Sequence, residues 1–127
     1  MCAMAEHLFS YGTLQDPKVQ RATFGRELAR TADALPGYRT EPLEIHDADV
    51  VRTSGLAYHP ALVPTGRAAD VVAGSLLVLT PTELAAADTY EVDDYVRVPV
   101  TLVSGATAWA YVSRAHTGAA PGATDDR

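Results

Sequence analysis

The sequence lacks features that several classes of protein need. Its 127 residues include one cysteine, Cys2, so no disulfide can form within the chain and a reducing compartment is expected. No long apolar run follows Met1, which argues against a secretory signal and a membrane span. We therefore expect a cytoplasmic protein without a membrane partner.

Basic and aromatic residues are also few. Ten Lys and Arg against sixteen Asp and Glu give a net charge of −6, and the basic residues are scattered along the chain. A duplex-binding protein needs clustered cations to displace counterions, so we expect no nucleic-acid partner. Apolar residues make up 47% of the chain and aromatic residues 7%. Val, Leu and Ala must therefore supply most of one globular core.

Residues that usually bind metals or act as nucleophiles are poorly placed. The four histidines are far apart in the sequence, and none has a second His or Cys at metal-ligand spacing. They are His7, His46, His59 and His116. We interpret each as structural or exposed. No serine lies in a Gly-x-Ser-x-Gly context, so a serine hydrolase is rejected.

Apolar patterns and turn residues predict about six or seven short strands with two short helices. The helices are expected over 17–24, after Asp16-Pro17 and before Gly25, and over 81–90, after a Thr80–Glu83 capping box. Strands are expected over 7–12, 28–35, 38–46, 55–58, 71–79, 95–103 and 107–112, with the almost wholly apolar 71–79 buried on both faces.

Strands outnumber helices and do not alternate regularly with them. This pattern favours an α+β fold with a curled or closed sheet over a doubly wound sheet. We expect a single domain over residues 1–114. Residues 115–127 are rich in Ala, Gly, Thr and Asp, which predicts a flexible C-terminal tail.

Residues 8–14 run from an apolar strand into a glycine turn just before the first predicted helix. Gly12 allows dihedral angles that a side chain would forbid and lets a ligand come close to the backbone. The N–H groups of Gly12, Thr13 and Leu14 can then point at a carboxylate or phosphate. Taken alone, Tyr11-Gly12-Thr13-Leu14 is explained more simply as a strand end that turns into a helix.

Four carboxylates fall within residues 88–94, between a predicted helix and a predicted strand. A solvated acidic loop is the usual explanation of such a run. Glu91 is distinctive because Tyr90 and Val92 flank it, and partial desolvation would raise its pKa and suit it to proton transfer. The spacing does not match a calcium loop. Arg97 is expected to pair with Asp88 or Asp94 in a structural role.

Together these residues resemble the γ-glutamylcyclotransferase / AIG2-like family. The resemblance rests on Phe9-Ser10-Tyr11-Gly12-Thr13-Leu14, on Tyr90-Glu91 about eighty residues later, and on Tyr95-x-Arg97. Two middle segments, 58–64 and 72–76, follow in the family's usual order. The resemblance covers roughly residues 7–113.

The resemblance implies a small mixed β-barrel with flanking helices. It also implies an enzyme that cleaves a γ-glutamyl amine or peptide and releases 5-oxoproline and a free amine, with no metal and no organic cofactor. Its site residues would be Glu91 as general base and acid, and Tyr11, Gly12, Thr13 and Leu14 as the substrate cradle. We add Tyr95 and Tyr111 as substrate-binding residues, although core packing is the commoner fate of such side chains.

The sequence departs from the family pattern at Val92, where many members have glycine directly after the acid. The chain is also short, so loops that would contact the leaving amine are trimmed. An alternative is therefore a sensor that binds a small carboxylate on the same fold without turnover. A protein-interaction domain is a third, weaker interpretation.

Overall fold

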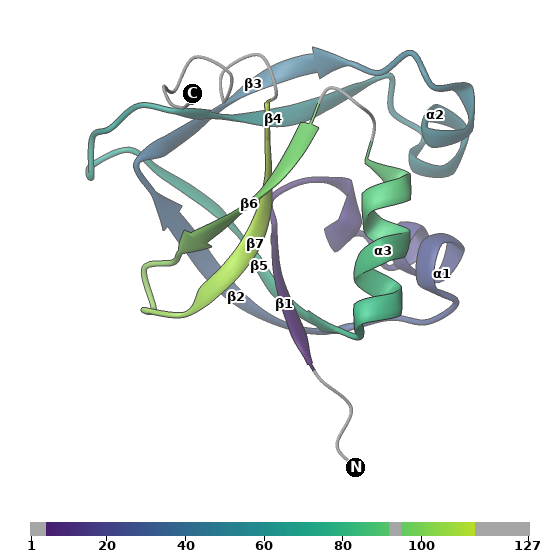
Figure 1. The fold of residues 1–127 in the computed structure, drawn as a ribbon. Helices are drawn as coiled ribbons and strands as arrows, with labels where there is room; N and C mark the ends of the chain where they lie inside the picture. The colour runs from purple at the N-terminus through teal and green to yellow at the C-terminus, as the bar shows by residue number, and fades with distance from the viewer. Residues whose placement is uncertain (1–4, 92–94, 114–127) are drawn as a thin grey trace.

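The computed structural model describes residues 5–91 and 95–113, and these form seven strands and three α-helices (Figure 1). The strands are β1 (Glu6–Ser10), β2 (Ala29–Pro36), β3 (Tyr38–Glu44), β4 (Tyr58–Pro64), β5 (Val71–Leu79), β6 (Tyr95–Thr101) and β7 (Thr107–Ser113). The helices are α1 (Pro17–Phe24), α2 (Ala48–Ser54) and α3 (Pro81–Tyr90), and a short 3-10 helix, η1 (Thr13–Gln15), follows β1.

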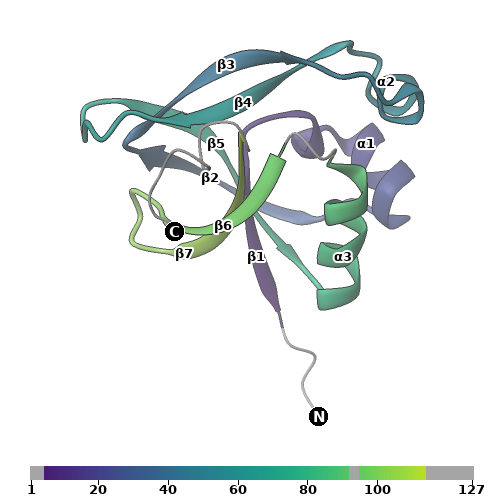
Figure 2. The same cartoon turned by 45° about the horizontal axis from the view of Figure 1, so that its top comes forward.

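All seven strands belong to one mixed sheet in the order β2-β5-β1-β7-β4-β3, with β6 paired to β7. β7 is parallel to both β1 and β4, and the other pairs are antiparallel. Each parallel contact has a single register pair, Leu8 with Trp109 and Leu62 with Val112. The sheet curls around β7 into a half-barrel, as Figures 1 and 2 show, which confirms the expected α+β mixed barrel.

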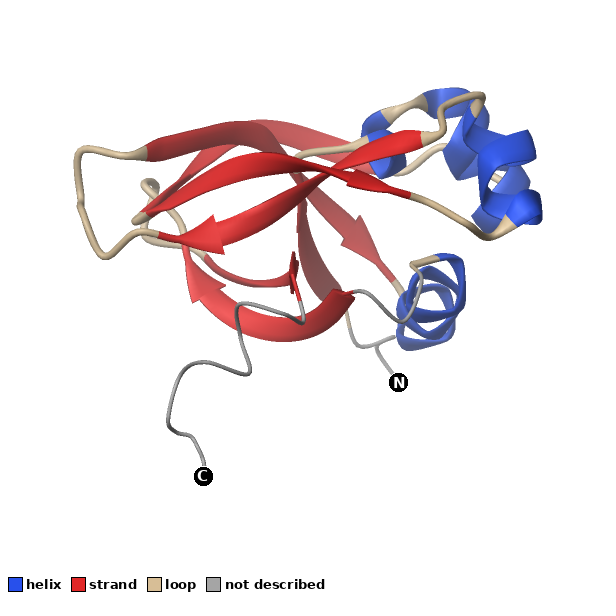
Figure 3. Cartoon of the chain, turned by 90° about the horizontal axis from the view of Figure 1, so that it is seen from above, coloured by secondary structure: helices blue, strands red, loops and turns tan. Residues whose placement is uncertain are grey.

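The curled sheet separates two apolar clusters. Leu8 belongs to the cluster beneath the helices, with residues from α1, α2 and α3, whereas its neighbour Phe9 belongs to the other. This division follows from strand geometry, since successive side chains point to opposite faces. Seen from above, the helices gather beside one end of the sheet (Figure 3).

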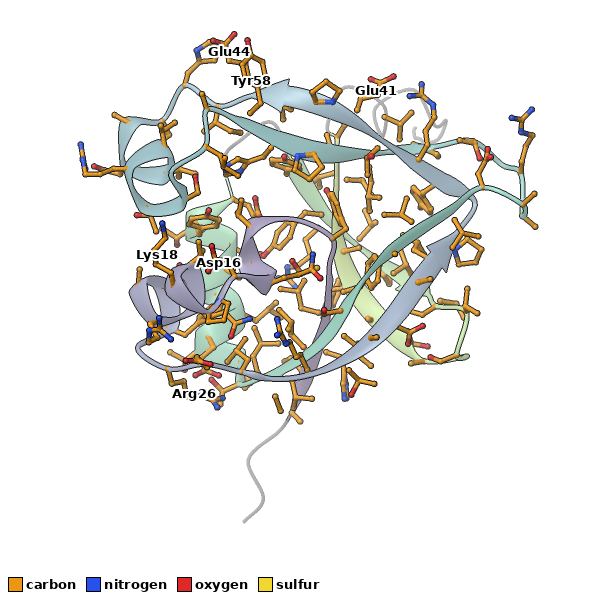
Figure 4. The ribbon with its side chains drawn as sticks, turned by 180° about the vertical axis from the view of Figure 1, so that it is seen from behind. Asp16, Lys18, Arg26, Glu41, Glu44 and Tyr58 are labelled. Atoms are coloured by element: carbon orange, nitrogen blue, oxygen red, sulfur yellow. The ribbon has the colours of Figure 1, made fainter. Side chains whose placement is uncertain are left out.

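The sequence signals at the ends of α1 and α3 act as expected. The Asp16 carboxylate caps α1 by accepting a hydrogen bond from the Lys18 N–H at 2.9 Å, and Gly25 ends the helix with φ 79°. Figure 4 shows Asp16 and Lys18 at this helix start. At α3, the Glu83 N–H donates to the Thr80 hydroxyl at 3.1 Å, and the Thr80 N–H donates to the Glu83 carboxylate at 2.9 Å. Both helices have the predicted bounds.

α2 was not predicted, although the sequence carries its signals. The Asp47 carboxylate accepts hydrogen bonds from the N–H groups of Asp49 and Val50, and Gly55 ends the helix with φ 77°. Gly55 is therefore not the start of a strand over 55–58, as the sequence pattern predicted. The strand in this region, β4, instead begins at Tyr58 and continues to Pro64.

One pair of strands contains facing prolines, and one further strand prediction was wrong in detail. β4 passes through Pro60, which lies opposite Pro42 of β3, so two residues without an N–H group face each other in the ladder. β5 has the predicted bounds but is not buried on both faces, because Val71 is 50% and Val78 38% exposed. The apolar composition of β5 gave no information about which face is covered.

Three stretches of the chain lie outside the described residues: 1–4, 92–94 and 114–127. The expected tail over 115–127 falls there, as do Cys2 and Val92. Within the described ranges, no helix is long and apolar enough to cross a membrane.

Candidate functional site

A pocket opens where β1 leads into η1, close to the point where the chain leaves α3. The space between its walls, including the open mouth, is about 310 Å³. Its lining includes every site residue predicted from the sequence, namely Tyr11, Gly12, Thr13, Leu14, Glu91, Tyr95 and Tyr111. The remaining lining residues are Leu8, Phe9, Ser10, His59 and Pro60. Residues from both ends of the chain therefore meet in one cavity.

Gly12 is required by a close approach to β4. Its φ of −134° is outside the left-handed region, so the expected need for unusual dihedral angles is not the reason for glycine. A Cβ at this position would lie 3.2 Å from Cγ of Pro60, which is tighter than ordinary contact. Glycine thus lets the loop lie against β4 and leaves its backbone accessible from the pocket.

The backbone N–H groups of this loop are oriented by η1. The Gln15 N–H donates to the Gly12 carbonyl at 3.1 Å, and the Asp16 N–H donates to the Thr13 carbonyl at 3.0 Å. The N–H groups at the start of a helical turn have no acceptor within the turn. Among the described residues, none accepts a hydrogen bond from the N–H of Gly12, Thr13 or Leu14. These groups are free to bind an anion.

The loop is anchored through its side chains. Leu14 is 1% exposed and belongs to the cluster beneath the helices, so only its backbone can meet a ligand. The buried Gln20 amide donates to the Leu14 carbonyl at 2.8 Å. The Thr13 hydroxyl lies 2.7 Å from the Tyr90 hydroxyl, at the end of α3. The cradle is therefore held by α1 on one side and α3 on the other.

Tyr11 forms part of the pocket wall and links β4 to β7. Its hydroxyl donates to the Tyr111 carbonyl at 2.6 Å and accepts from the Leu62 N–H at 3.3 Å. Burial, with smaller contributions from Tyr95 and Glu91, raises the pKa of this phenol far above its usual range. Tyr11 is thus neutral at all ordinary pH values, and its hydroxyl is occupied by the sheet.

Glu91 is the first residue after α3, and its N–H donates to the Ala87 carbonyl at 2.9 Å. None of the described residues forms a hydrogen bond or an ion pair with its carboxyl group. Burial, followed by the nearby Asp88 carboxylate, raises the pKa of Glu91 to about 8. An acid with this pKa can take up and release protons near neutral pH. Unlike a residue in a solvated acidic loop, Glu91 faces the cavity.

The other two predicted tyrosines use their hydroxyl groups within the protein. Tyr95 donates to the Pro60 carbonyl at 2.7 Å, and Tyr111 donates to the Asp88 carboxylate at 2.6 Å. Both residues are about 5% exposed. They line the pocket mainly with their rings. Arg97 pairs with Asp88, one of the two partners expected for it, at 2.8 Å.

His59 lines the pocket, although its sequence context predicted only a structural or exposed residue. It is 4% exposed, its Nε2 lies 3.0 Å from the Ser54 hydroxyl, and its ring stacks on Tyr90 with centroids 6.5 Å apart. Burial lowers the pKa of this imidazole, so it is neutral at pH 7. Strand alternation was the available signal, because His59 is two residues before the buried Ala61 on β4.

In the described part of the chain, no group of three or more His, Cys, Asp and Glu residues is arranged to hold a metal ion. The pocket instead offers free N–H groups on one side and an acid of raised pKa on another. The fold and this cavity define a small α+β protein with a pocket suited to a carboxylate-bearing ligand and to proton transfer.

Comparison with known proteins defines the class more closely. The chain belongs to the gamma-glutamyl cyclotransferase, AIG2-like family, whose family model matches residues 8–126. No curated protein matches the sequence.

Two solved structures from Arabidopsis thaliana are similar in fold. The solution structure of At5g39720.1 has a TM-score of 0.70 at 25% identity, over 97% of this chain and 76% of that one. The solution structure of At3g28950.1 has a TM-score of 0.68 at 24% identity, over 89% of this chain. This chain covers 66% of the length of At3g28950.1. The likeness confirms the architecture.

Proposed function

We propose that this protein cleaves γ-glutamyl amines or peptides by attack of the substrate's own α-amino group on its γ-carbonyl carbon. The products are 5-oxoproline and the free amine. One observation carries the proposal: Glu91, an acid of raised pKa without a partner among the described residues, shares a cavity with the free N–H groups of the Tyr11–Leu14 loop. Family membership supports the same chemistry.

The reaction needs no nucleophile from the protein. A new C–N bond forms between the α-nitrogen and the γ-carbon, and the original amide C–N bond breaks. Holding the glutamyl group in a conformation close to attack can lower the barrier by several kcal/mol, up to about 10. The N–H groups of Gly12, Thr13 and Leu14 would bind the α-carboxylate or the developing oxyanion.

Glu91 would move the protons that this exchange requires. The attacking α-ammonium group must lose two protons, and the departing nitrogen must gain two to leave as an ammonium ion. In the free protein Glu91 is mostly protonated at pH 7, because its pKa is about 8. A bound α-ammonium group would favour the carboxylate form. Glu91 could then accept a proton from one nitrogen and deliver it to the other.

The test is to incubate the protein with a panel of γ-glutamyl dipeptides and γ-glutamyl amines and to measure 5-oxoproline and free amine in equal amounts. Glu91→Gln should reduce turnover by roughly 10²–10⁴-fold, the usual contribution of a positioned acid–base group. Glu44→Gln is the matched control. Its side chain is 54% exposed, and Figure 4 shows it beside Tyr58, where β3 ends and β4 begins.

Two results would overturn the proposal: no product from any member of the panel, or full activity in Glu91→Gln. Calorimetry with the same compounds separates the alternative, a sensor for small carboxylates. Tight binding of a γ-glutamyl compound without product would favour the sensor.

A further inference from the structure

A cluster centred on Asp88 joins the last turn of α3 to β6 and β7. The Arg97 guanidinium donates two hydrogen bonds to the Asp88 carboxylate, from Nε to Oδ1 at 2.8 Å and from Nη2 to Oδ2 at 3.0 Å. Oδ1 also accepts a hydrogen bond from the Tyr111 hydroxyl at 2.6 Å. The same guanidinium lies over the Trp109 ring, 4.4 Å from its centroid. Two side chains of the sheet, Arg97 and Tyr111, thus bind one carboxylate of the helix, and Trp109 packs against one of them.

This cluster is one turn of helix away from Glu91. Asp88 precedes Glu91 by three residues, and Ala87, beside it, accepts the hydrogen bond from the Glu91 N–H. On the opposite side of this turn, Tyr90 reaches the loop through Thr13. The end of α3 is therefore attached both to the sheet and to the cradle, and Glu91 follows immediately.

Stabilisation of the fold is a poor explanation for the cluster. The side chains of Asp88 and Arg97 are 40% and 26% exposed, and ion pairs at such positions contribute about 0–1 kcal/mol. The Asp88–Arg97 pair also affects the charges near Glu91. The described titratable groups around Glu91 are Tyr11, His59, Asp88, Tyr90, Tyr95 and Tyr111, and the Arg97 guanidinium joins this group through its ion pair with Asp88. The Asp88 carboxylate pairs with the Arg97 guanidinium and so compensates its positive charge.

We propose that Asp88 is a positioning residue for Glu91. Held by Tyr111 and Arg97, it fixes the last turn of α3 and prevents the guanidinium from neutralising the pocket acid. This role rests on the proposed function of Glu91 as proton carrier. Its electrostatic part can be measured in the free protein, without turnover.

The first measurement is a titration of the Glu91 carboxyl carbon by NMR in the free protein, with Glu91→Gln used to assign the signal. Asp88→Asn removes a negative charge and leaves Arg97 uncompensated, so the midpoint should fall by about 1 pH unit. Arg97→Gln leaves Asp88 uncompensated, so the midpoint should rise by a similar amount. A purely structural role would not produce shifts of opposite sign.

Glu83→Gln is the matched control. Glu83 makes a similar two-pronged contact with Arg26, at 2.7 and 2.8 Å, at the other end of α3. The Glu83→Gln variant should leave the titration midpoint of Glu91 unchanged. Trp109 is the single tryptophan of the chain, so its fluorescence reports the cluster directly. Emission should change in Asp88→Asn and stay the same in Glu83→Gln.

The second measurement is the kinetics of Asp88→Asn on whichever substrate the panel identifies. Loss of position should lower kcat by about 10–100-fold and change KM much less. The proposal is overturned if the midpoints in Asp88→Asn and Arg97→Gln both stay within about 0.3 pH unit of the wild type. Absence of any 5-oxoproline would instead count against the proposed function, and the midpoints would still decide whether Asp88 acts on Glu91.

Discussion

At the scale of single residues, Glu91 differs from the other acids whose titration is shifted. Hydrogen bonds from Ser104, Thr65 and Arg26, respectively, lower the pKa values of Asp33, Asp70 and Glu83. For Glu91, burial and the Asp88 carboxylate act in the opposite direction and raise the pKa to about 8. The fold therefore places at the pocket an acid, Glu91, whose ionisation is unfavourable. Such acids are typical of sites that move protons.

This difference predicts how stability depends on pH. The folded-state pKa of Glu91, about 8, is above its unfolded value of 4.5, so folding favours the protonated acid. Its contribution to stability is complete below pH 4.5 and is lost as the pH rises through about 8. Glu91→Gln should therefore stabilise the protein at pH 9 by about 1–3 kcal/mol relative to its effect at pH 5.

Urea denaturation of Glu91→Gln and wild type at pH 5, 7 and 9 measures this effect. Glu41→Gln is the control for the exchange of a carboxylate for an amide, because its side chain is 40% exposed and its partner is Arg39. A stability difference for Glu91→Gln that is equal at the three pH values would show that Glu91 ionises normally in the folded protein.

At the scale of secondary-structure elements, the sequence predicted best where local hydrogen bonds decide the outcome. Asp16-Pro17 with Gly25, and Thr80 with Glu83, satisfied the bonds at the ends of α1 and α3, and these bounds were correct. α2 was missed because Gly55 was assigned to a strand. The exposed face of β5 could not be predicted, because burial depends on which elements pack against it and apolar residues alone do not specify that.

The capping box of α3 should have a measurable effect, since this helix leads to Glu91. Thr80→Ala removes the hydroxyl that accepts the Glu83 N–H at 3.1 Å, and the loss of such a cap costs about 1 kcal/mol. Thr82→Ala, at an exposed position of the same turn, should cost much less. Urea denaturation compares the two variants. Equal losses would mean that the cap does not stabilise the helix.

At the scale of the whole molecule, Tyr11 links strands that are otherwise weakly joined. β4 and β7 have a single register pair, Leu62 with Val112. The Tyr11 hydroxyl binds the Tyr111 carbonyl of β7 and the Leu62 N–H of β4. The sequence indicated Tyr11 as part of the cradle, but this link between distant segments could not be predicted from local pattern.

Tyr11→Phe keeps the ring and leaves two buried backbone groups without their partner. It should destabilise the protein by about 1–3 kcal/mol, the cost of unsatisfied buried polar groups. Tyr38→Phe is the matched control, because no described residue forms a hydrogen bond with the half-buried Tyr38 hydroxyl. Thermal denaturation of both variants tests the link. A loss in Tyr38→Phe as large as that in Tyr11→Phe would contradict it.

Part of the pocket lining was predicted from the sequence. The sequence pattern and the family resemblance named seven residues that line one pocket, including Glu91 from the far end of the chain. The involvement of the hydroxyl groups of Tyr11, Tyr95 and Tyr111 in hydrogen bonds within the protein emerged only from the structure. Such contacts join residues separated by up to 100 positions, and no sequence spacing encodes them.

We propose that Glu91 carries protons in a pocket that holds a γ-glutamyl group. The most direct test is the pH dependence of kcat/KM for 5-oxoproline release. In the wild type, kcat/KM should rise with pH along an acidic limb whose midpoint is at about 8, the pKa of Glu91 in the free protein. In Glu91→Gln, the residual rate should lack this limb. Unchanged activity in Glu91→Gln with the same profile as the wild type would show that Glu91 does not carry the protons.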